Sequence, residues 1–438
     1  MGEDDNNSDE GLIRTIGPKA LGTNIFNMVV GAGIFVLPGY VAAQLGAAAL
    51  FAYFICAGAV ALIFLCYAEI GSRITRSGGS YAYIEDAFGT FPGFIASTLL
   101  WFGWAVFSDA ALTIAMVDTI TIAVPLLNDP VWRAVFIIAL LSFMAFTNVI
   151  GVKSGIRFAI FNTAIKIIPL ALLLVVGLTM IKFENLAITE IPSLENIGAG
   201  TLLLIFAFCG AETALNTSGE FHRPSRTVPA GILLGMGSIF IVYLGLQTVA
   251  QGVLGDGLAQ NTEAPLAAAA EIVFGEWGGT LLLAGAAISI FGTLSGDILA
   301  TPRVIFAAAR DDNLPGILSK VHPVYKTPHV AIMLYAFAIG AIALSGSFQT
   351  LAVLASGSIL LVYAGVCAAA LKVRLRDGDP GEGEFKMPGK TIIPILGCSV
   401  IAWMLYQMSG KEWMGLIIFL IISTVLYFLQ KFIKNRSG

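Results

Sequence analysis

Ionisable residues interrupt several stretches of this sequence that are otherwise apolar: Asp109, Asp118, Lys166, Glu212 and Asp297. A charged side chain inside a membrane helix costs roughly 3 kcal/mol or more unless it is paired or hydrated, so each is a candidate for function. Asp118 stands near the end of its stretch, where its carboxylate is expected to reach the membrane interface. Glu69, beside Arg73 at the end of another stretch, is expected to form an ion pair with it at the boundary.

Lys166 and Asp297 are expected at similar depth. Each stands about ten to twelve residues from a helix end, or roughly 15 Å deep at the helical rise. In one interpretation the two side chains form a permanent ion pair. In the other, which we favour, Asp297 faces a ligand pocket and selects a cationic group.

The elements that must position these residues are membrane helices. Apolar residues make up 57% of the 438 positions and charged residues 12%, whereas a soluble domain carries roughly 25% charged residues. About 20 mainly apolar residues in a helix cross a bilayer. The sequence therefore predicts an all-α polytopic membrane protein with about twelve transmembrane helices, at 18–45, 46–72, 91–126, 131–150, 156–181, 199–219, 227–254, 278–310, 328–345, 348–372, 391–409 and 413–431.

Other kinds of site are not expected. All five cysteines fall in apolar windows, where cysteine packs as a small hydrophobic residue, so we expect no disulfide, metal site or cofactor. The formal net charge of -4 comes without a basic cluster, which argues against a nucleic-acid partner. The three histidines fall in or beside expected loops without a nucleophile or metal-ligand grouping, which argues against an enzyme.

Two of the expected helices are interrupted by glycine near mid-membrane. The first (18–45) contains Gly31-Ala32-Gly33, and the sixth (199–219) contains Cys209-Gly210-Ala211. Glycine in a membrane helix can instead allow neighbouring helices to pack closely. Corresponding breaks in two inverted halves, however, point to the binding site of a secondary transporter. The halves would be the first five helices and the next five.

Four sets of residues, at the expected helices and in order, resemble the amino acid-polyamine-organocation (APC) superfamily of amino acid permeases from about 17 to 376. They are Gly31-Ala-Gly33-Ile-Phe with Pro38, Ala68-Glu69-Ile-Gly71 with Ser77-Gly-Gly-Ser80-Tyr81, Phe208-Cys-Gly210-Ala-Glu212 with Gly219-Glu220, and Arg303 with Ala309-Arg310-Asp311. The resemblance implies a five-plus-five inverted-repeat (LeuT-like) fold with helices 1 and 6 broken. It also implies alternating access and an α-amino acid held between those two helices.

The chemistry of broken helices leads to the same site. Freed N–H groups favour a carboxylate and freed carbonyls favour an ammonium group, so the two breaks suit a zwitterion. We expect the amides of Ala32, Gly33 and Ile34 to bind the carboxylate, and the carbonyls of Met28, Val29, Phe206 and Ala207 to bind the amine, with Gly31, Cys209 and Gly210 forming the breaks. Many family members have serine where this chain has Ala32. No hydroxyl is present here, so the carboxylate would be bound by backbone N–H groups alone.

The resemblance also assigns side-chain roles. Phe206 matches an aromatic gate over the substrate, which we favour over the alternative of a lipid-facing or core phenylalanine. Gly103, Trp104, Ser108 and Ser356 match positions that line the side-chain pocket. Glu212 matches an acid that takes part in proton coupling, or it braces the broken helix through local hydrogen bonds.

Lys166 matches a lysine that some sodium-independent members carry where sodium-coupled relatives bind a cation. Its ammonium would bridge the carbonyls around Val30 and Gly31 to Thr293. We therefore expect a sodium-independent amino acid transporter of the cell inner (plasma) membrane, either a proton symporter or an exchanger. The alternative cargo is a polyamine or another organic cation, with Asp297 and Asp109 as ligands. A membrane-embedded enzyme or a nutrient receptor is a remote alternative.

Most of the 24 Lys and Arg residues fall on one side of the expected helices, which predicts cytoplasmic N- and C-termini. Residues 1–17 are expected to form a disordered cytoplasmic tail and 18–372 the transport core. A cytoplasmic loop at 373–390 and the last two helices with a short tail at 391–438 follow. Whether the protein is a monomer or a homodimer is left open.

Overall fold

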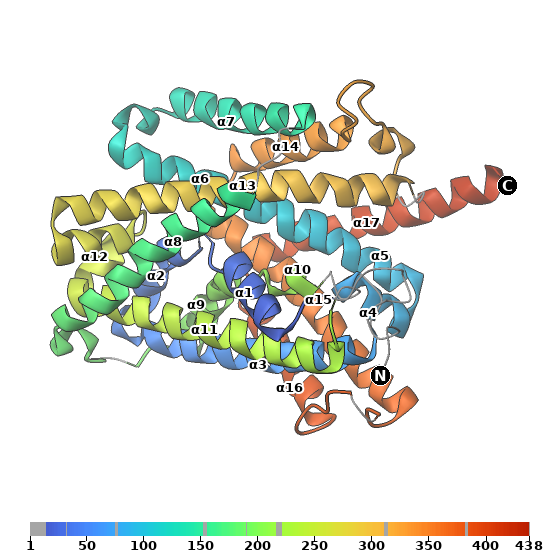
Figure 1. The fold of residues 1–438 in the computed structure, drawn as a ribbon, viewed down its shortest axis with the longest axis horizontal. Coiled ribbons are helices and arrows are strands. Elements are labelled where there is room, and N and C mark those ends of the chain that lie inside the picture. Colours follow the sequence, from blue (N-terminus) through green and yellow to red (C-terminus); the bar gives the residue numbers. More distant parts are fainter. Residues whose placement is uncertain are drawn as a thin grey trace.

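The structure is a computed structural model that describes residues 15–31, 33–74, 78–151, 156–189, 191–215, 221–310, 314–381 and 384–437, with side chains except at 156–165 and 433–437. Ala32 and most of the expected N-terminal tail therefore lie outside the described residues. The described residues form helices joined by loops (Figure 1). The first half of the chain contains α1 (Pro18–Val29), α2 (Gly33–Leu45), α3 (Ala49–Arg73), α4 (Gly79–Phe88), α5 (Thr90–Thr98), the π-helix η3 (Leu99–Val106), α6 (Phe107–Ala123), α7 (Pro130–Ile150) and α8 (Ile156–Gly177).

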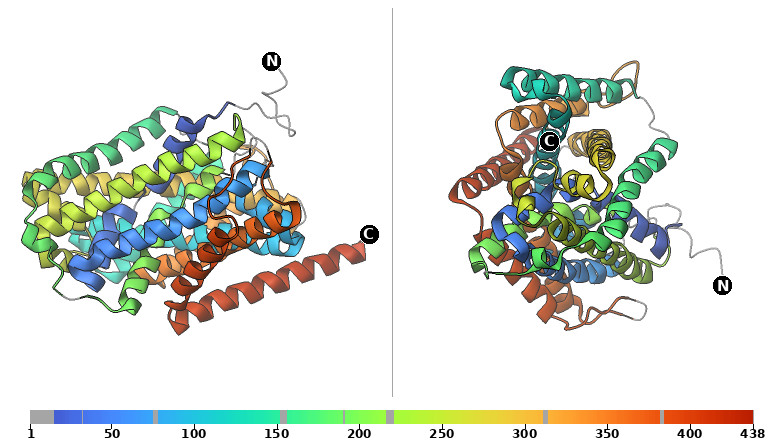
Figure 2. Two further views of the ribbon diagram at one scale, coloured as in Figure 1. Left: turned by 90° about the horizontal axis from the view of Figure 1, so that it is seen from below. Right: turned by 90° about the vertical axis from the view of Figure 1, so that its left-hand side faces the viewer.

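The second half follows with α9 to α17. Their bounds are α9 (Leu194–Phe208), α10 (Ala211–Ala214), α11 (Pro224–Leu254), α12 (Pro265–Phe274), α13 (Glu276–Arg310), α14 (His329–Ala343), α15 (Phe348–Asp377), α16 (Ile392–Tyr406) and α17 (Gly410–Ser437). The helix α17 lies along the outside of the bundle and extends away from it (Figure 2).

The helices confirm a multi-pass helical membrane protein. Eight helical stretches among the described residues are long and apolar enough to cross a bilayer, and shorter apolar helices accompany them. Large apolar side chains also cover the outside, where Leu233 is 75% exposed and Phe337 is 74% exposed. An outer surface of this kind requires lipid around it.

Helix ends follow local chemistry. The helix α7 begins where the Asp129 carboxylate accepts hydrogen bonds from the backbone N–H groups of Val131 and Trp132, with Pro130 at the first position. It ends at Gly151, whose φ of 79° is the left-handed conformation that glycine adopts readily. These signals explain why the predicted range 131–150 agrees with the structure to within one residue.

Two short helices were missed by the sequence analysis. Both α4 and α12 have only 10 residues. They are too short to cross a bilayer, so a search for apolar windows of membrane length passes over them.

Close backbone contact holds α1 against α11. A Cβ atom at Gly231 would lie 2.7 Å from the Leu21 side chain, and one at Gly235 would lie 2.6 Å from Ile25. Glycine on α11 therefore lets α1 approach closely, as small residues do between membrane helices. The first helix break, at the end of α1, is positioned by this packing.

Candidate functional site

The first break separates α1 from α2. The helical hydrogen bonds end with Val30 N–H, which donates to Phe26 O at 3.0 Å, whereas Gly31 N–H turns back to Val29 O at 2.7 Å. Gly31 therefore does not bond to Asn27 O, its helical partner four residues earlier. The regular helical hydrogen bonding therefore ends at this point.

The second break separates α9 from α10. It contains Cys209 and Gly210, and Gly210 has a φ of 116°, which an L side chain rarely adopts. The Glu212 carboxylate accepts a hydrogen bond from Gly210 N–H at 3.0 Å and another from the Tyr363 hydroxyl at 2.7 Å. Glu212 is only 2% exposed, so it braces the break from inside the protein.

The two breaks lie against each other. A Cβ atom at Gly210 would lie 3.2 Å from Met28 O, and one at Gly33 would lie 3.1 Å from the Ala207 Cα atom. This contact brings most of the predicted backbone groups into one place. Ile34 follows Gly33 on α2 and is 1% exposed.

Tyr243 connects the breaks, and sequence analysis did not single it out. Its hydroxyl lies 2.9 Å from Val29 O and 3.1 Å from Ala207 O, so its proton is shared between two carbonyls that were expected to bind an amine. Tyr243 belongs to α11, and nothing in its sequence context distinguishes it from the other ten of the 11 tyrosines.

An aromatic cluster covers Phe206. Its ring centroid lies 5.7 Å from that of Trp104 and 5.8 Å from that of Phe348, and Phe206 is 6% exposed. Ser108 and Ser356 are also buried, and the Ser356 hydroxyl has no hydrogen-bond partner among the described residues. Gly103 instead faces α15, because a Cβ atom there would lie 2.8 Å from the Ser358 Oγ atom.

Lys166 reaches the first break from α8. Its ammonium donates to Asn27 O at 2.7 Å, and the residue is 5% exposed. The expected contact was with the carbonyls around Val30 and Gly31. In the structure Lys166 instead contacts the carbonyl of Asn27, three residues before Val30. Thr293 lies nearby, since its Oγ1 atom would be 3.7 Å from a Cβ atom at Gly31, but its hydroxyl donates to Ser289 O.

Asp297 lies beside a second aspartate. It is within hydrogen-bonding reach of Asp109, which is fully buried and accepts a hydrogen bond from the Tyr335 hydroxyl at 2.8 Å. No ion pair joins Asp297 to Lys166 in the part of the chain that the structure describes. This carboxyl pair lies where α6, α13 and α14 meet. Asp118, expected at the interface, pairs with Arg133 at 2.6 Å.

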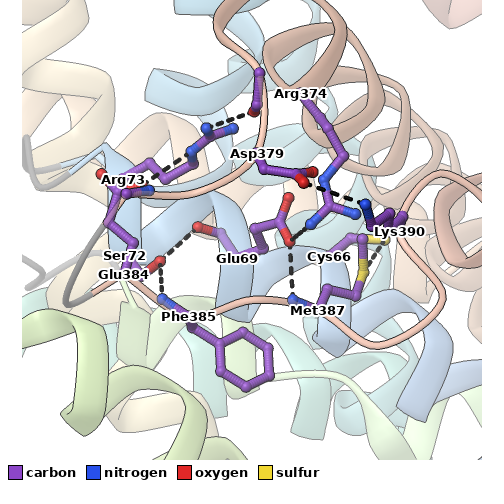
Figure 3. Close-up of polar contacts among 12 residues, drawn as sticks. Cys66, Glu69, Ser72, Arg73, Arg374, Asp379, Glu384, Phe385, Met387 and Lys390 are labelled. Carbon is purple, nitrogen blue, oxygen red and sulfur yellow. Dashed lines mark hydrogen bonds and ion pairs between the residues drawn. The ribbon is translucent and has the colours of Figure 1, made fainter.

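The expected pair of Glu69 with Arg73 is wrong. Glu69 pairs with Arg374 of α15 at 2.5 Å, and both side chains are almost fully buried (Figure 3). Arg73 instead pairs with Glu384 at 3.3 Å and donates to Gly378 O. The loop after α15 folds onto the end of α3. Glu69 and Arg374 are 305 residues apart, so their contact could not be predicted from the sequence.

The same loop is fixed by its own backbone and by exposed charges. Met387 N–H donates to the Glu69 carboxylate at 2.9 Å, and Phe385 N–H donates to the Ser72 hydroxyl at 3.1 Å (Figure 3). The Lys390 ammonium, 3.2 Å from Asp379, lowers the pKa of that exposed carboxyl. The loop is therefore part of the packed structure at this end of the protein.

A helical membrane protein whose two broken helices meet in its interior has the architecture of a secondary transporter. Comparison with known proteins then gives the family. The profile of the amino acid permease family matches residues 21–428, and the chain belongs to that family of the APC superfamily, whose members are transporters rather than enzymes. The resemblance seen in the motifs is thereby confirmed.

Several relatives have been characterised. The methylthioribose transporter of Bacillus subtilis is 27% identical over 438 residues, which cover 95% of this chain and 93% of that protein. The serine/threonine exchanger SteT of Bacillus subtilis is 32% identical over 335 residues, which cover 74% and 75%. The cadaverine/lysine antiporter of Escherichia coli is 28% identical over 301 residues, which cover 67% and 66%.

Proposed function

We propose that this protein carries amino acids across the cell inner (plasma) membrane by alternating access, without sodium, as a proton symporter or an exchanger. The observation that carries the proposal is the contact between the two helix breaks, where Gly210 approaches Met28 O. The relatives include a serine/threonine exchanger and a branched-chain amino acid permease, which supports an amino acid as cargo.

The proposed architecture has twelve spans. In it, α1 to α8 supply the first five spans, α9 to α15 supply the inverted second five, and α16 and α17 are appended. Residues 18–372 form the transport core, 1–17 and the end of 391–438 are cytoplasmic tails, and 373–390 is a cytoplasmic loop. The positive-inside rule supports this orientation.

The substrate is proposed to lie between the breaks. The backbone N–H groups of Gly33 and Ile34 at the start of α2 bind its carboxylate together with that of Ala32, because the N-terminal end of a helix attracts an anion. Carbonyls at the end of α1 and of α9 bind its amine. Two of them, at Val29 and Ala207, already accept from Tyr243, which holds them at a fixed separation. Phe206 closes over the substrate, and Trp104, Ser108 and Ser356 line the side-chain pocket.

The coupling residues are proposed to be Lys166, Thr293 and Glu212. Lys166 supplies a fixed positive charge next to the first break, where a sodium ion would otherwise be needed to bind the freed carbonyl. Glu212 joins the second break to α15 through Tyr363. Protonation of its carboxylate would weaken the hydrogen bonds that it accepts from Gly210 N–H and from the Tyr363 hydroxyl.

A polyamine or another organic cation is the second candidate cargo. The contact between Asp297 and Asp109 favours it, because no described cation pairs with either carboxyl. The relative that exchanges cadaverine and lysine gives further support. In this case Asp297 selects the charge of the cargo from the edge of the pocket.

Counterflow in proteoliposomes tests both candidates. Vesicles loaded with one unlabelled compound are given trace amounts of labelled amino acids or polyamines, and accumulation identifies the cargo. We expect accumulation of at least one α-amino acid, unchanged when potassium or choline replaces sodium. Accumulation of diamines without any amino acid would establish the second candidate, and no accumulation of either class would overturn the proposal.

A further inference from the structure

An apolar groove runs along the outside of the bundle between α15 and α16. Its volume is about 530 Å³, and its walls include Ala368 and Leu371 of α15 with Ile395 and Ala402 of α16. The groove faces outward, because Ile395 is 53% exposed. Both helices belong to the apolar part of the chain, so acyl chains rather than water adjoin this surface.

The groove carries one positively charged side chain on its wall. Lys372 lies on its wall in the last turns of α15, with its ammonium 4.8 Å from the ring centroid of Phe88. No carboxylate pairs with Lys372 among the described residues. Arg376, one turn further along α15, is already paired with Asp86 and Asp377. Lys372 therefore contributes the uncompensated charge at the groove.

The dimensions suit the upper part of one acyl chain below a headgroup. The α15 wall extends from Ala368 to Leu375, which is roughly 10 Å along a helix. A lysine within such a wall directs its ammonium towards the polar interface while its methylene groups remain on the apolar surface. Basic groups between membrane helices at this level bind anionic lipid headgroups.

We propose that the groove between α15 and α16 binds one anionic phospholipid, with an acyl chain against Ala368 and Ala402 and the phosphate paired with Lys372. A zwitterionic lipid fills the apolar part equally well. The excess charge of Lys372 selects for a net negative headgroup. The site is separate from the helix breaks and does not depend on the cargo.

A cysteine within the groove reports its occupancy. Cys398 lines the groove and is partly exposed, whereas Cys56, Cys66, Cys209 and Cys367 are buried. The full-length protein, purified in detergent, is labelled with an apolar maleimide in the presence of phosphatidylglycerol or phosphatidylcholine with matched acyl chains. We expect phosphatidylglycerol to slow labelling of Cys398 at least several-fold more than phosphatidylcholine does.

Variants separate the headgroup from the acyl chain. Lys372→Gln should abolish the difference between the two lipids, Lys372→Arg should retain it, and Lys320→Gln, which removes an exposed lysine elsewhere, should leave it unchanged. Ala402→Trp, which fills the groove, should remove protection by either lipid. Equal protection by both lipids in the unmodified protein, no protection by either, or a preference that survives Lys372→Gln would each overturn the proposal. None of these results depends on transport.

Discussion

The ammonium of Lys166 donates a hydrogen bond of 2.7 Å to the carbonyl oxygen of Asn27, and this contact joins α8 to the end of α1. Gly31 N–H, the helical donor for that oxygen, bonds to Val29 O instead of continuing the helix. A positive charge buried at this point stabilises the broken end of α1, since the last carbonyls of a helix carry partial negative charge. The lysine and the break therefore depend on each other.

Lys166→Ala removes that charge and its hydrogen bond to Asn27 O. We expect uptake to fall by an order of magnitude or more, because a hydrogen bond to a charged group contributes about 1.5–3 kcal/mol and the end of α1 loses its support. Uptake by the unmodified protein should be the same in sodium, potassium and choline. Sodium-dependent uptake by the unmodified protein would rule out the proposed role of Lys166.

Tyr243→Phe tests the bridge between the two breaks. The change removes a hydroxyl that contacts Val29 O and Ala207 O but keeps the ring that packs on Phe208 at 5.2 Å. We expect the apparent affinity for substrate to fall about tenfold, with folded protein recovered in normal yield. Tyr406→Phe, at an exposed site, serves as the control. Equal uptake kinetics for the two variants would show that the bridge does not organise the site.

Asp297→Asn tests the selection of cargo charge. If Asp297 faces the cargo, the variant should lose transport of cationic amino acids and polyamines far more than that of neutral amino acids, because a desolvated charge that loses its partner costs about 3–5 kcal/mol. The measurement is competition of both classes against one labelled substrate. Asp256→Asn, which neutralises an exposed loop residue, is the control. Equal loss for both classes would indicate that Asp297 has a structural role with Asp109.

Arg374→Met tests the buried ion pair at the end of α3. Glu69 would be left buried without its partner, which should lower the free energy of unfolding by about 3–5 kcal/mol. The double variant with Glu69→Met should recover much of that loss. Arg376→Met breaks an exposed pair, which solvent and salt screen, so it should lower the free energy of unfolding far less than Arg374→Met does. Denaturation of the purified proteins in detergent measures these losses of stability. Equal losses for Arg374→Met and Arg376→Met would contradict the prediction.

Features encoded by neighbouring residues were predicted from the sequence. The two breaks follow from Gly31, Gly33 and Gly210 inside apolar stretches. The depth of Lys166 in the membrane stays a prediction. Its partner was not predicted, because the sequence does not show that Gly31 N–H bonds to Val29 O and leaves its helical position opposite Asn27 O to Lys166.

Contacts between distant segments were not predictable in the same way. Tyr363 and Glu212 are 151 residues apart, and Arg374 and Glu69 are 305 residues apart. Each partner alone is an ordinary residue near the middle or end of a helix. Only the packing of α15 against α3, α9 and α10 shows that Glu69 prefers Arg374 to Arg73, its neighbour on the next turn.

Binding of amino acid to the Gly33→Val variant tests the central claim most directly. A side chain at Gly33 would press on Ala207, 3.1 Å from its Cα atom, and so push the two breaks apart. Gly58→Val is the matched control, because a Cβ atom at Gly58 would meet nothing within 4 Å. We predict that the Gly33→Val protein remains folded and monodisperse but no longer binds the amino acid identified by counterflow, while Gly58→Val binds it normally. Unchanged binding by Gly33→Val would contradict a substrate site between the two breaks.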